Sequence, residues 1–234
     1  GLSLDENLTR LSAAPLYFAP GEGWRYSLGT DVLGGVLEKV EDRGLAEIVR
    51  DKVTAPLGIE DTDFTVRDPS RLVQAYADGD PEPRLMTDGI AVPMMGLDAI
   101  FAPSRILDPA SYPSGGAGMA GTAGDVLRFL EAIRTGGAPI LKPETVKAMV
   151  QDQVGPQAQT QGPGWGFSYG WAVLTDPAPT GTPQAAGTLQ WGGAYGHSWF
   201  IDRENGLSVV ALTNTAFEGM AGAFPTAIRD AVYD

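Results

Sequence analysis

The chain has 234 residues, of which 43% are hydrophobic, and a formal net charge of −13. This composition is typical of a globular protein, and the acidic balance argues against nucleic-acid binding and against docking on an anionic membrane. With no cysteine and one histidine, disulfides, thiolate metal sites, a cysteine nucleophile and a poly-histidine metal site are excluded.

The first part of the chain is predicted to form three helices. Ser3 and Glu6 stand in a capping-box arrangement, so we expect a helix from there to about Ala13. A second helix opens at Ser27, with apolar residues at helical spacing, and a third covers about 45–54. Glycines inside the second helix lower its propensity, so we expect a close packing partner there.

The middle of the chain is irregular. Residues 60–112 are rich in proline and in acidic turns, and we expect extended segments that run over the surface. Loops of this length often line a site. Thr122 then caps a helix that has Asp125 at its third position. Pro143 starts another helix, which ends near Gln151.

The last part of the chain is predicted to be mostly strands. Residues 162–174 alternate in aromatic side chains and indicate one strand. Two further runs, 191–202 and 207–214, flank the turn 203–206, whose Asn-Gly pair is typical of a β-hairpin. Glycines at the head of the 191–202 run mark a place where a ligand or another backbone comes close. A helix over about 222–233 closes the chain.

This order of elements predicts an α+β architecture with an antiparallel sheet flanked by helices. We expect residues 1–125 to form part of a helical and loop-rich region that lines the site. Residues 126–234 are expected to supply the C-terminal helices and the antiparallel strands.

Tyr26 is the first candidate for chemistry. It lies just before a predicted helix, and the positive end of the helix dipole stabilises an anion there. A nearby lysine would lower the phenol pKa further, and such a tyrosine can act as a general base. The alternative is a half-buried aromatic residue whose hydroxyl is simply hydrogen-bonded.

Other motifs are weaker on the residues alone. His197 and Ser198 match part of a Gly-x-Ser-x-Gly nucleophile elbow, but the last glycine is replaced and the chain continues as a strand. The glycine-rich turn 114–118 lacks the ending of a phosphate-binding loop, so we interpret it as structural. The aromatic residues of 165–171 and 191–200 suit an apolar substrate pocket, with a plain core as the alternative.

Four segments carry motifs that occur together in one superfamily. The run from Phe18 to Ser27 surrounds Tyr26, and 56–62 reads Pro-Leu-Gly-Ile-Glu-Asp-Thr. Residues 115–130 include Gly-Gly-Ala-Gly, Thr-Ala-Gly-Asp and Phe-Leu, and 191–193 is Trp-Gly-Gly. Together they resemble the serine β-lactamase and penicillin-binding-protein-like superfamily. The Trp-Gly-Gly form is similar to the family VIII carboxylesterases, which share the class C β-lactamase fold.

The resemblance implies a serine hydrolase that works without metal or cofactor. In such enzymes a Ser-x-x-Lys motif supplies the nucleophile, and the tyrosine that corresponds to Tyr26 deprotonates it and later protonates the leaving group. The backbone N–H of Ala194 completes an oxyanion hole with the nucleophile's own N–H. The residues expected to bind substrate are Trp191, Gly192, Gly193, Tyr195 and His197.

Two departures from the family pattern matter. No serine of this chain is followed three residues later by lysine, so the chain resembles the C-terminal part of one β-lactamase-like domain. We expect an N-terminal segment or a companion chain to carry Ser-x-x-Lys. Leu28 stands where class C enzymes have asparagine, and Trp191 replaces the cationic or histidine residue of the third motif. Because an indole cannot pair with the carboxylate of a β-lactam, this favours an ester substrate.

The sequence therefore predicts a carboxylesterase that acts on small to medium carboxylic esters through an acyl-enzyme. A β-lactamase or D-Ala peptidase/amidase is the second enzyme hypothesis. The third is a non-catalytic β-lactamase-like module for binding or assembly. We expect a small-molecule substrate, no nucleic-acid partner, no membrane span and a cytoplasmic location, with the periplasm left open.

Overall fold

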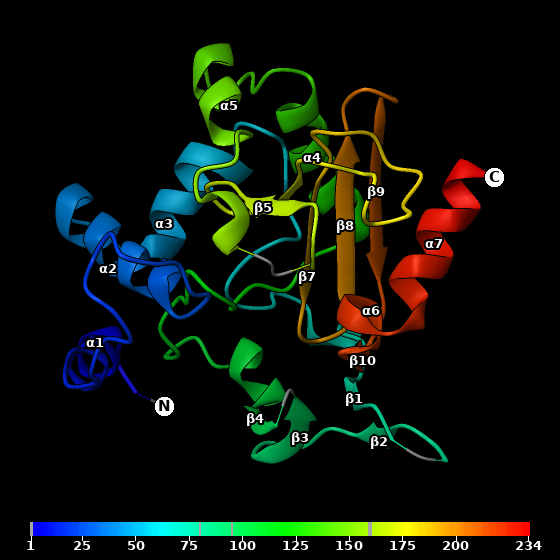
Figure 1. Ribbon diagram of the computed structural model, residues 1–234. Coiled ribbons are helices and arrows are strands. Elements are labelled where there is room, and N and C mark those ends of the chain that lie inside the picture. Colours follow the sequence, from blue (N-terminus) through cyan, green and yellow to red (C-terminus); the bar gives the residue numbers. More distant parts are fainter. Residues whose placement is uncertain (1, 80, 95, 159–160) are drawn as a thin grey trace.

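The structure, a computed structural model, describes residues 2–79, 81–94, 96–158 and 161–234 (Figure 1). Its helices and strands form an α+β arrangement, as predicted. The helices are α1 (Leu4–Ser12), α2 (Gly29–Glu41), α3 (Leu45–Val49), α4 (Ala123–Arg134), α5 (Pro143–Met149), α6 (Glu218–Ala221) and α7 (Ala223–Tyr233). The strands are β1 (Tyr76–Ala77), β2 (Arg84–Leu85), β3 (Ile90–Met94), β4 (Leu97–Phe101), β5 (Trp165–Phe167), β6 (Ala172–Leu174), β7 (Leu189–Gly193), β8 (His197–Asp202), β9 (Leu207–Leu212) and β10 (Thr215–Ala216). None of the helices in the described ranges is long and apolar enough to cross a membrane.

The main sheet has five antiparallel strands in the order β5-β6-β7-β8-β9. Alternate residues of β8 point to opposite faces. Ile201 packs with Leu130 and Ile133 of α4 in one core, whereas the Phe200 ring stacks on Tyr233 of α7 at 6.2 Å. Helices thus cover both faces of this sheet (Figure 1).

A smaller lobe lies below the main sheet (Figure 1). It contains the sheet β10-β1-β2, in which β1 and β10 are parallel, and the hairpin β3–β4. Its core residues include Val92 and Phe101, and Ala194 and Tyr195 pack against them. The 60–112 region is therefore extended, as predicted, and it supports the turn that follows β7.

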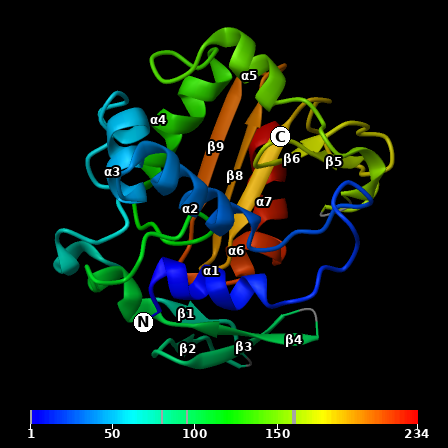
Figure 2. The ribbon, with the colours of Figure 1, turned by 90° about the vertical axis from the view of Figure 1, so that its left-hand side faces the viewer.

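Helices α1 to α3 form a separate layer in front of the sheet (Figure 2). The glycines of α2 allow close packing, as expected: a Cβ at Gly35 would lie 2.7 Å from Leu8, and one at Gly34 would lie 3.0 Å from Leu45. The buried carboxylate of Asp31 accepts a 2.6 Å hydrogen bond from the Ser114 hydroxyl. The 114–118 turn is thus structural, as interpreted from the sequence.

The apolar stripe of α2 faces outward. Its side chains are 37% to 75% exposed, whereas Asp31 on the same helix is 3% exposed. The stripe consists of Val32, Leu33, Val36, Leu37 and Val40. In a helix of a globular protein the apolar face ordinarily packs against a core, so this orientation is the reverse of the usual one.

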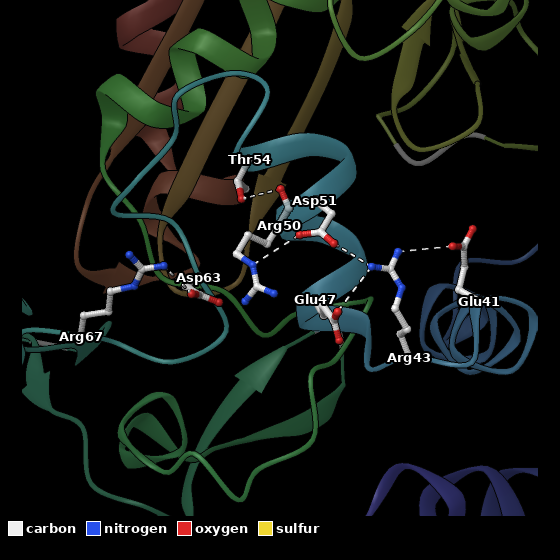
Figure 3. A network of polar contacts seen from close by, with 8 residues as sticks. All are labelled: Glu41, Arg43, Glu47, Arg50, Asp51, Thr54, Asp63 and Arg67. Atoms are coloured by element: carbon white, nitrogen blue, oxygen red, sulfur yellow. Dashed lines mark hydrogen bonds and ion pairs between the residues drawn. The ribbon is translucent and has the colours of Figure 1, made fainter.

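An ion-pair network ties α2 to α3 on the outer surface (Figure 3). Arg43 contacts Glu41, Glu47 and Asp51, with its shortest N–O distance, 2.6 Å, to Asp51. The Asp51 hydrogen bond is the main cause that raises the pKa of Arg43. Exposed pairs of this kind contribute little to stability, so the network adds little to the free energy of unfolding.

Two strand predictions were wrong. Residues 162–174 form two strands, because Ser168 turns the chain and both its N–H and its hydroxyl donate to the Trp171 carbonyl. The run 191–202 is also divided, between β7 and β8, by a turn in which the Gly196 N–H donates to the Gly193 carbonyl. Aromatic alternation continued through both turns in the sequence and concealed them. The boundary at residues 125 and 126 stays a prediction.

Candidate active site

Four aromatic side chains from three parts of the chain meet beside the sheet. The ring of Tyr26 lies 5.2 Å from that of Trp191, centroid to centroid. Phe167 meets Trp191 edge-on at 5.2 Å and meets Trp24 at 4.9 Å. The structure therefore brings together Tyr26 and Trp191, which the sequence singled out, and adds Trp24 and Phe167.

Tyr26 reaches this cluster from the segment that precedes α2. Helix α2 begins at Gly29, and its N-cap residue Leu28 makes no side-chain capping hydrogen bond. The Tyr26 side chain is 56% exposed, so the phenol is accessible. Tyr26 precedes the N-terminus of α2 by three residues.

Ala194 lies in the turn between β7 and β8, and its two backbone groups differ. Its carbonyl accepts a 3.0 Å hydrogen bond from the Phe217 N–H. Its N–H donates to no acceptor within the ranges that the structure describes. Most buried or half-buried N–H groups in a folded protein have a partner. Because the Ala194 N–H has none in the described part of the chain, a ligand oxygen can bind to it.

The rest of the turn is fixed by hydrogen bonds and close packing. The Gly196 carbonyl accepts from the Thr213 N–H at 3.0 Å and from the Thr213 hydroxyl at 2.6 Å. Gly196 has φ 105° and faces the Thr215 carbonyl, where a Cβ would collide. Only glycine fits both conditions without strain.

The other sequence-predicted site residues lie around this turn. Met220 of α6 packs against Gly192 and leaves no room for a side chain there: a Cβ at Gly192 would lie 2.8 Å from the Met220 side chain. Gly193 pairs with His197 across β7 and β8, and a Cβ on Gly193 would touch the imidazole. The Tyr195 ring packs edge-on against Phe101 of the small lobe, with the ring centroids 5.0 Å apart.

Burial shifts the pKa of two of these residues toward the neutral form. Desolvation is the main cause that lowers the pKa of His197, so its imidazole is neutral at pH 7. Desolvation likewise raises the pKa of the Tyr195 phenol. His197 continues directly into β8, which excludes the helix that a nucleophile elbow needs.

Two further segments of the family pattern, 56–62 and 115–130, have structural roles. Thr122 caps α4 by accepting from the Asp125 N–H at 3.2 Å, as predicted. The Asp125 carboxylate in turn accepts from the Asp61 N–H at 2.9 Å and from the Thr62 hydroxyl at 3.2 Å. The 56–62 stretch is thereby fastened to α4.

Two open depressions of the surface lie on the small lobe. Both are lined by Asp78, Gly79 and Pro93, and one of about 420 Å³ also includes Val92 and Phe217. The aromatic cluster lines neither of them.

The sequence signals differed in strength for these residues. Tyr26 and Trp191 lay inside recognisable motifs, and Trp24 lay inside the quoted 18–27 segment. Phe167 appeared only within the aromatic 165–171 run, and nothing local distinguished it from Tyr169 or Trp171. The roles assigned to individual residues stay predictions.

Comparison with known proteins finds a family match, a curated relative and similar solved structures. The profile of the family described as Beta-lactamase matches residues 2–233. Esterase EstB of Burkholderia gladioli is 58% identical over 234 residues, which covers 98% of this chain and 59% of that protein. The solved structure of EstCE1, a hydrolase with promiscuous acyltransferase activity, matches with a TM-score of 0.97 and 51% identity, covering 100% of this chain and 62% of that one.

A more distant solved structure shares the fold alone. Simvastatin Synthase (LovD) from Aspergillus terreus matches with a TM-score of 0.75 at 20% identity, covering 94% of this chain and 58% of that one. In each of these matches this chain spans about three fifths of the relative's length.

Proposed function

The chain belongs to the beta-lactamase family, and on this premise we propose that it is part of a serine carboxylesterase that cleaves small to medium carboxylic esters through an acyl-enzyme. The observation that supports this most is the contact between Tyr26 and Trp191, because it joins two motif segments far apart in sequence. The 58% identity to Esterase EstB supports an ester as the substrate.

In the proposed reaction Tyr26 is the general base and Ala194 stabilises the oxyanion. Tyr26 takes the proton of a nucleophilic serine while the serine oxygen attacks the ester carbonyl carbon. The negative carbonyl oxygen accepts a hydrogen bond from the Ala194 N–H. As the carbonyl re-forms, the bond to the alcohol oxygen breaks and Tyr26 returns its proton to that oxygen. Water then attacks the acyl-enzyme in the same way and releases the acid.

We propose that the nucleophilic serine and its lysine lie on a segment of the same polypeptide outside these 234 residues. The length of the relatives supports this, because about two fifths of Esterase EstB lies outside the match. The outward apolar stripe of α2, which crosses in front of the sheet beside the Tyr26 segment, is a suitable surface for such a segment (Figure 2). A companion chain is the less economical arrangement, since the relatives carry the additional length in one chain.

The character of the cluster favours esters over β-lactams. Trp191 packs against the apolar core of Trp165, Ala172 and Leu174, so the site wall at this point has no charge. A lactam carboxylate would find no cation there, whereas a neutral acyl or alcohol group would bury apolar surface against the indole.

Acyl transfer to an alcohol is a second candidate activity. The specific observation is the likeness to EstCE1, the hydrolase with promiscuous acyltransferase activity, which is 51% identical. Transfer requires only that an alcohol replace water in the second half of the reaction. Hydrolysis with and without an added primary alcohol would measure the partition between the two.

The test is an assay of the longer protein that contains this chain. We expect it to hydrolyse short-chain p-nitrophenyl esters faster than nitrocefin or D-Ala-D-Ala peptides, with a covalent acyl adduct visible by mass spectrometry. Preference for nitrocefin or for the peptides would favour the lactamase or peptidase reading. Absence of all three activities in a folded longer protein would favour a non-catalytic module.

A further inference from the structure

The indole of Trp191 is the central ring of the aromatic cluster. Tyr26 contacts it at 5.2 Å with a 44° tilt, and Phe167 meets it at 5.2 Å with a 79° interplanar angle. Edge-to-face contacts of the second kind have a preferred geometry and therefore orient a ring as well as burying it. Phe167 thus constrains the ring on which Tyr26 lies.

The backbone of Phe167 is held firmly. Its N–H donates to the Asp152 carboxylate at 3.1 Å, and its carbonyl accepts from the Gln153 N–H at 2.8 Å. The same Asp152 oxygen also accepts from the N–H groups of Val154 and Gly155. A ring on so fixed a backbone is a stable support for its neighbour.

Within the described ranges, no hydrogen bond holds the Tyr26 side chain. It lies in an irregular segment with no capping hydrogen bond from the Leu28 side chain at the start of α2. Its ring contact with Trp191 is consequently a main constraint on the direction of the phenol. A general base must lie within hydrogen-bonding reach of the proton that it removes, so a displaced indole would misplace the base.

We propose that Phe167 is a positioning residue that holds the Trp191 indole against Tyr26 and thereby orients the phenol for proton transfer. This inference rests on the proposed esterase function. The Phe167 ring contacts Trp191 and Trp24 and not Tyr26, so it acts on the phenol indirectly, and a Trp191→Leu background tests the route through Trp191. The same constraint sets the position of the apolar wall that the acyl group meets.

The chain offers a matched control for this pair. Phe129 meets Trp171 at the same 79° interplanar angle, with centroids 6.1 Å apart, in the core beneath α4. Phe129→Leu removes a similar edge-to-face contact in which neither Trp191 nor Tyr26 takes part. It should lower thermal stability without changing the ratio of activities toward short and long acyl esters.

The experiment uses the longer protein and a double-mutant cycle. We expect Phe167→Leu to lower kcat for p-nitrophenyl acetate roughly three- to tenfold and to alter the preference between acetate and longer acyl esters, because loss of orientation weakens catalysis more than binding. Phe167→Tyr, which keeps the ring, should restore activity. In a Trp191→Leu background, Phe167→Leu should have no further effect, since the two residues act in series.

The outcomes separate this inference from the function on which it rests. If the unsubstituted longer protein hydrolyses no ester, the proposed function fails. If it is active but Phe167→Leu matches Phe129→Leu in kcat and acyl preference, or if the effects of Phe167→Leu and Trp191→Leu are additive, the positioning role is overturned.

Discussion

The two halves of the candidate site are supported in different ways. The turn that carries Ala194 is tied by hydrogen bonds from Phe217 and Thr213 and by glycines that fit against neighbouring backbone. The segment that carries Tyr26 rests on ring contacts and precedes a helix whose apolar stripe faces outward. The proposed oxyanion donor is thus held by hydrogen bonds within this chain, whereas the proposed general base is held mainly by ring contacts.

The largest expected effect comes from removing the proposed donor in the Ala194 turn. Ala194→Pro deletes the N–H, and we expect the longer protein to lose about 10²- to 10³-fold in kcat for ester hydrolysis. Ala194→Gly keeps the N–H and should stay within a few-fold of the parent. Steady-state kinetics, with thermal unfolding to verify the fold, measure both; equal activity of the two variants would contradict the role of Ala194.

The rigidity of the turn can be tested through Gly196. Gly196→Ala introduces a Cβ at φ 105° against the Thr215 carbonyl, so we expect a loss of about 2–4 kcal/mol in unfolding free energy. Gly206→Ala is the control, because its φ is 68° but its nearest neighbour is only the Arg134 side chain at 4.0 Å. It should cost about 1 kcal/mol. Similar losses in urea unfolding would show that the turn is not tightly fitted.

Strand β8, which follows the Ala194 turn, ends in a buried carboxylate, Asp202. Burial pushes the pKa of Asp202 upward, but hydrogen bonds from the Ala185 N–H, the Tyr233 hydroxyl and Asn205 outweigh it and leave the pKa below its usual 3.8. A carboxyl with a depressed folded pKa stabilises the fold above its unfolded pKa, and this stability is lost as the pH falls through the folded pKa.

We therefore expect Asp202→Asn to cost about 2 kcal/mol at pH 7, since buried donors lose their acceptor. It should also reduce the loss of stability below about pH 4 that the parent chain shows. Glu131 is the comparison, because the Arg134 hydrogen bond lowers its pKa to about 2 while 41% of its side chain is exposed. Glu131→Gln should change stability less, as solvent screens the pair. Denaturant unfolding from pH 2 to 7 measures both losses of stability. A larger loss for Glu131→Gln than for Asp202→Asn would contradict this expectation.

The smallest effect is expected on the outward face of α2. In the 234-residue chain, Val36→Ser should alter the unfolding free energy by no more than about 0.5 kcal/mol, because Val36 is 50% exposed. In the longer protein the same substitution should cost about 1–3 kcal/mol if a further segment buries this stripe. Equal costs in the two chains would indicate that the stripe stays exposed.

The sequence predicted local features well where a few neighbouring residues decide them. The Thr122 cap, its Asp125 partner and the Asn-Gly turn before β9 all formed as expected. The turn at Gly193 to Gly196 was missed because its stability comes from Thr213 and Phe217, which are distant in sequence. The helical spacing in α2 predicted a helix correctly, but spacing alone does not tell which face has a partner in the chain.

For the candidate site, the sequence predicted the residues that stand in motifs but not the residue that supports them. Tyr26 was singled out by its own chemistry, whereas the roles of Trp191 and Ala194 were implied by the resemblance to the superfamily. Phe167 became visible only when folding placed its edge on the Trp191 ring. A supporting residue has no chemical signature of its own, so its part in the site depends on three-dimensional contact.

The most direct test of the account is the rate of acylation in the longer protein with Tyr26→Phe. Mixing enzyme with p-nitrophenyl acetate and following the first turnover isolates the step in which Tyr26, as its phenolate, is proposed to remove the serine proton. We expect a fall of about 10²- to 10⁴-fold in this rate, with the thermal unfolding midpoint unchanged. Acylation at a rate near that of the parent would contradict it.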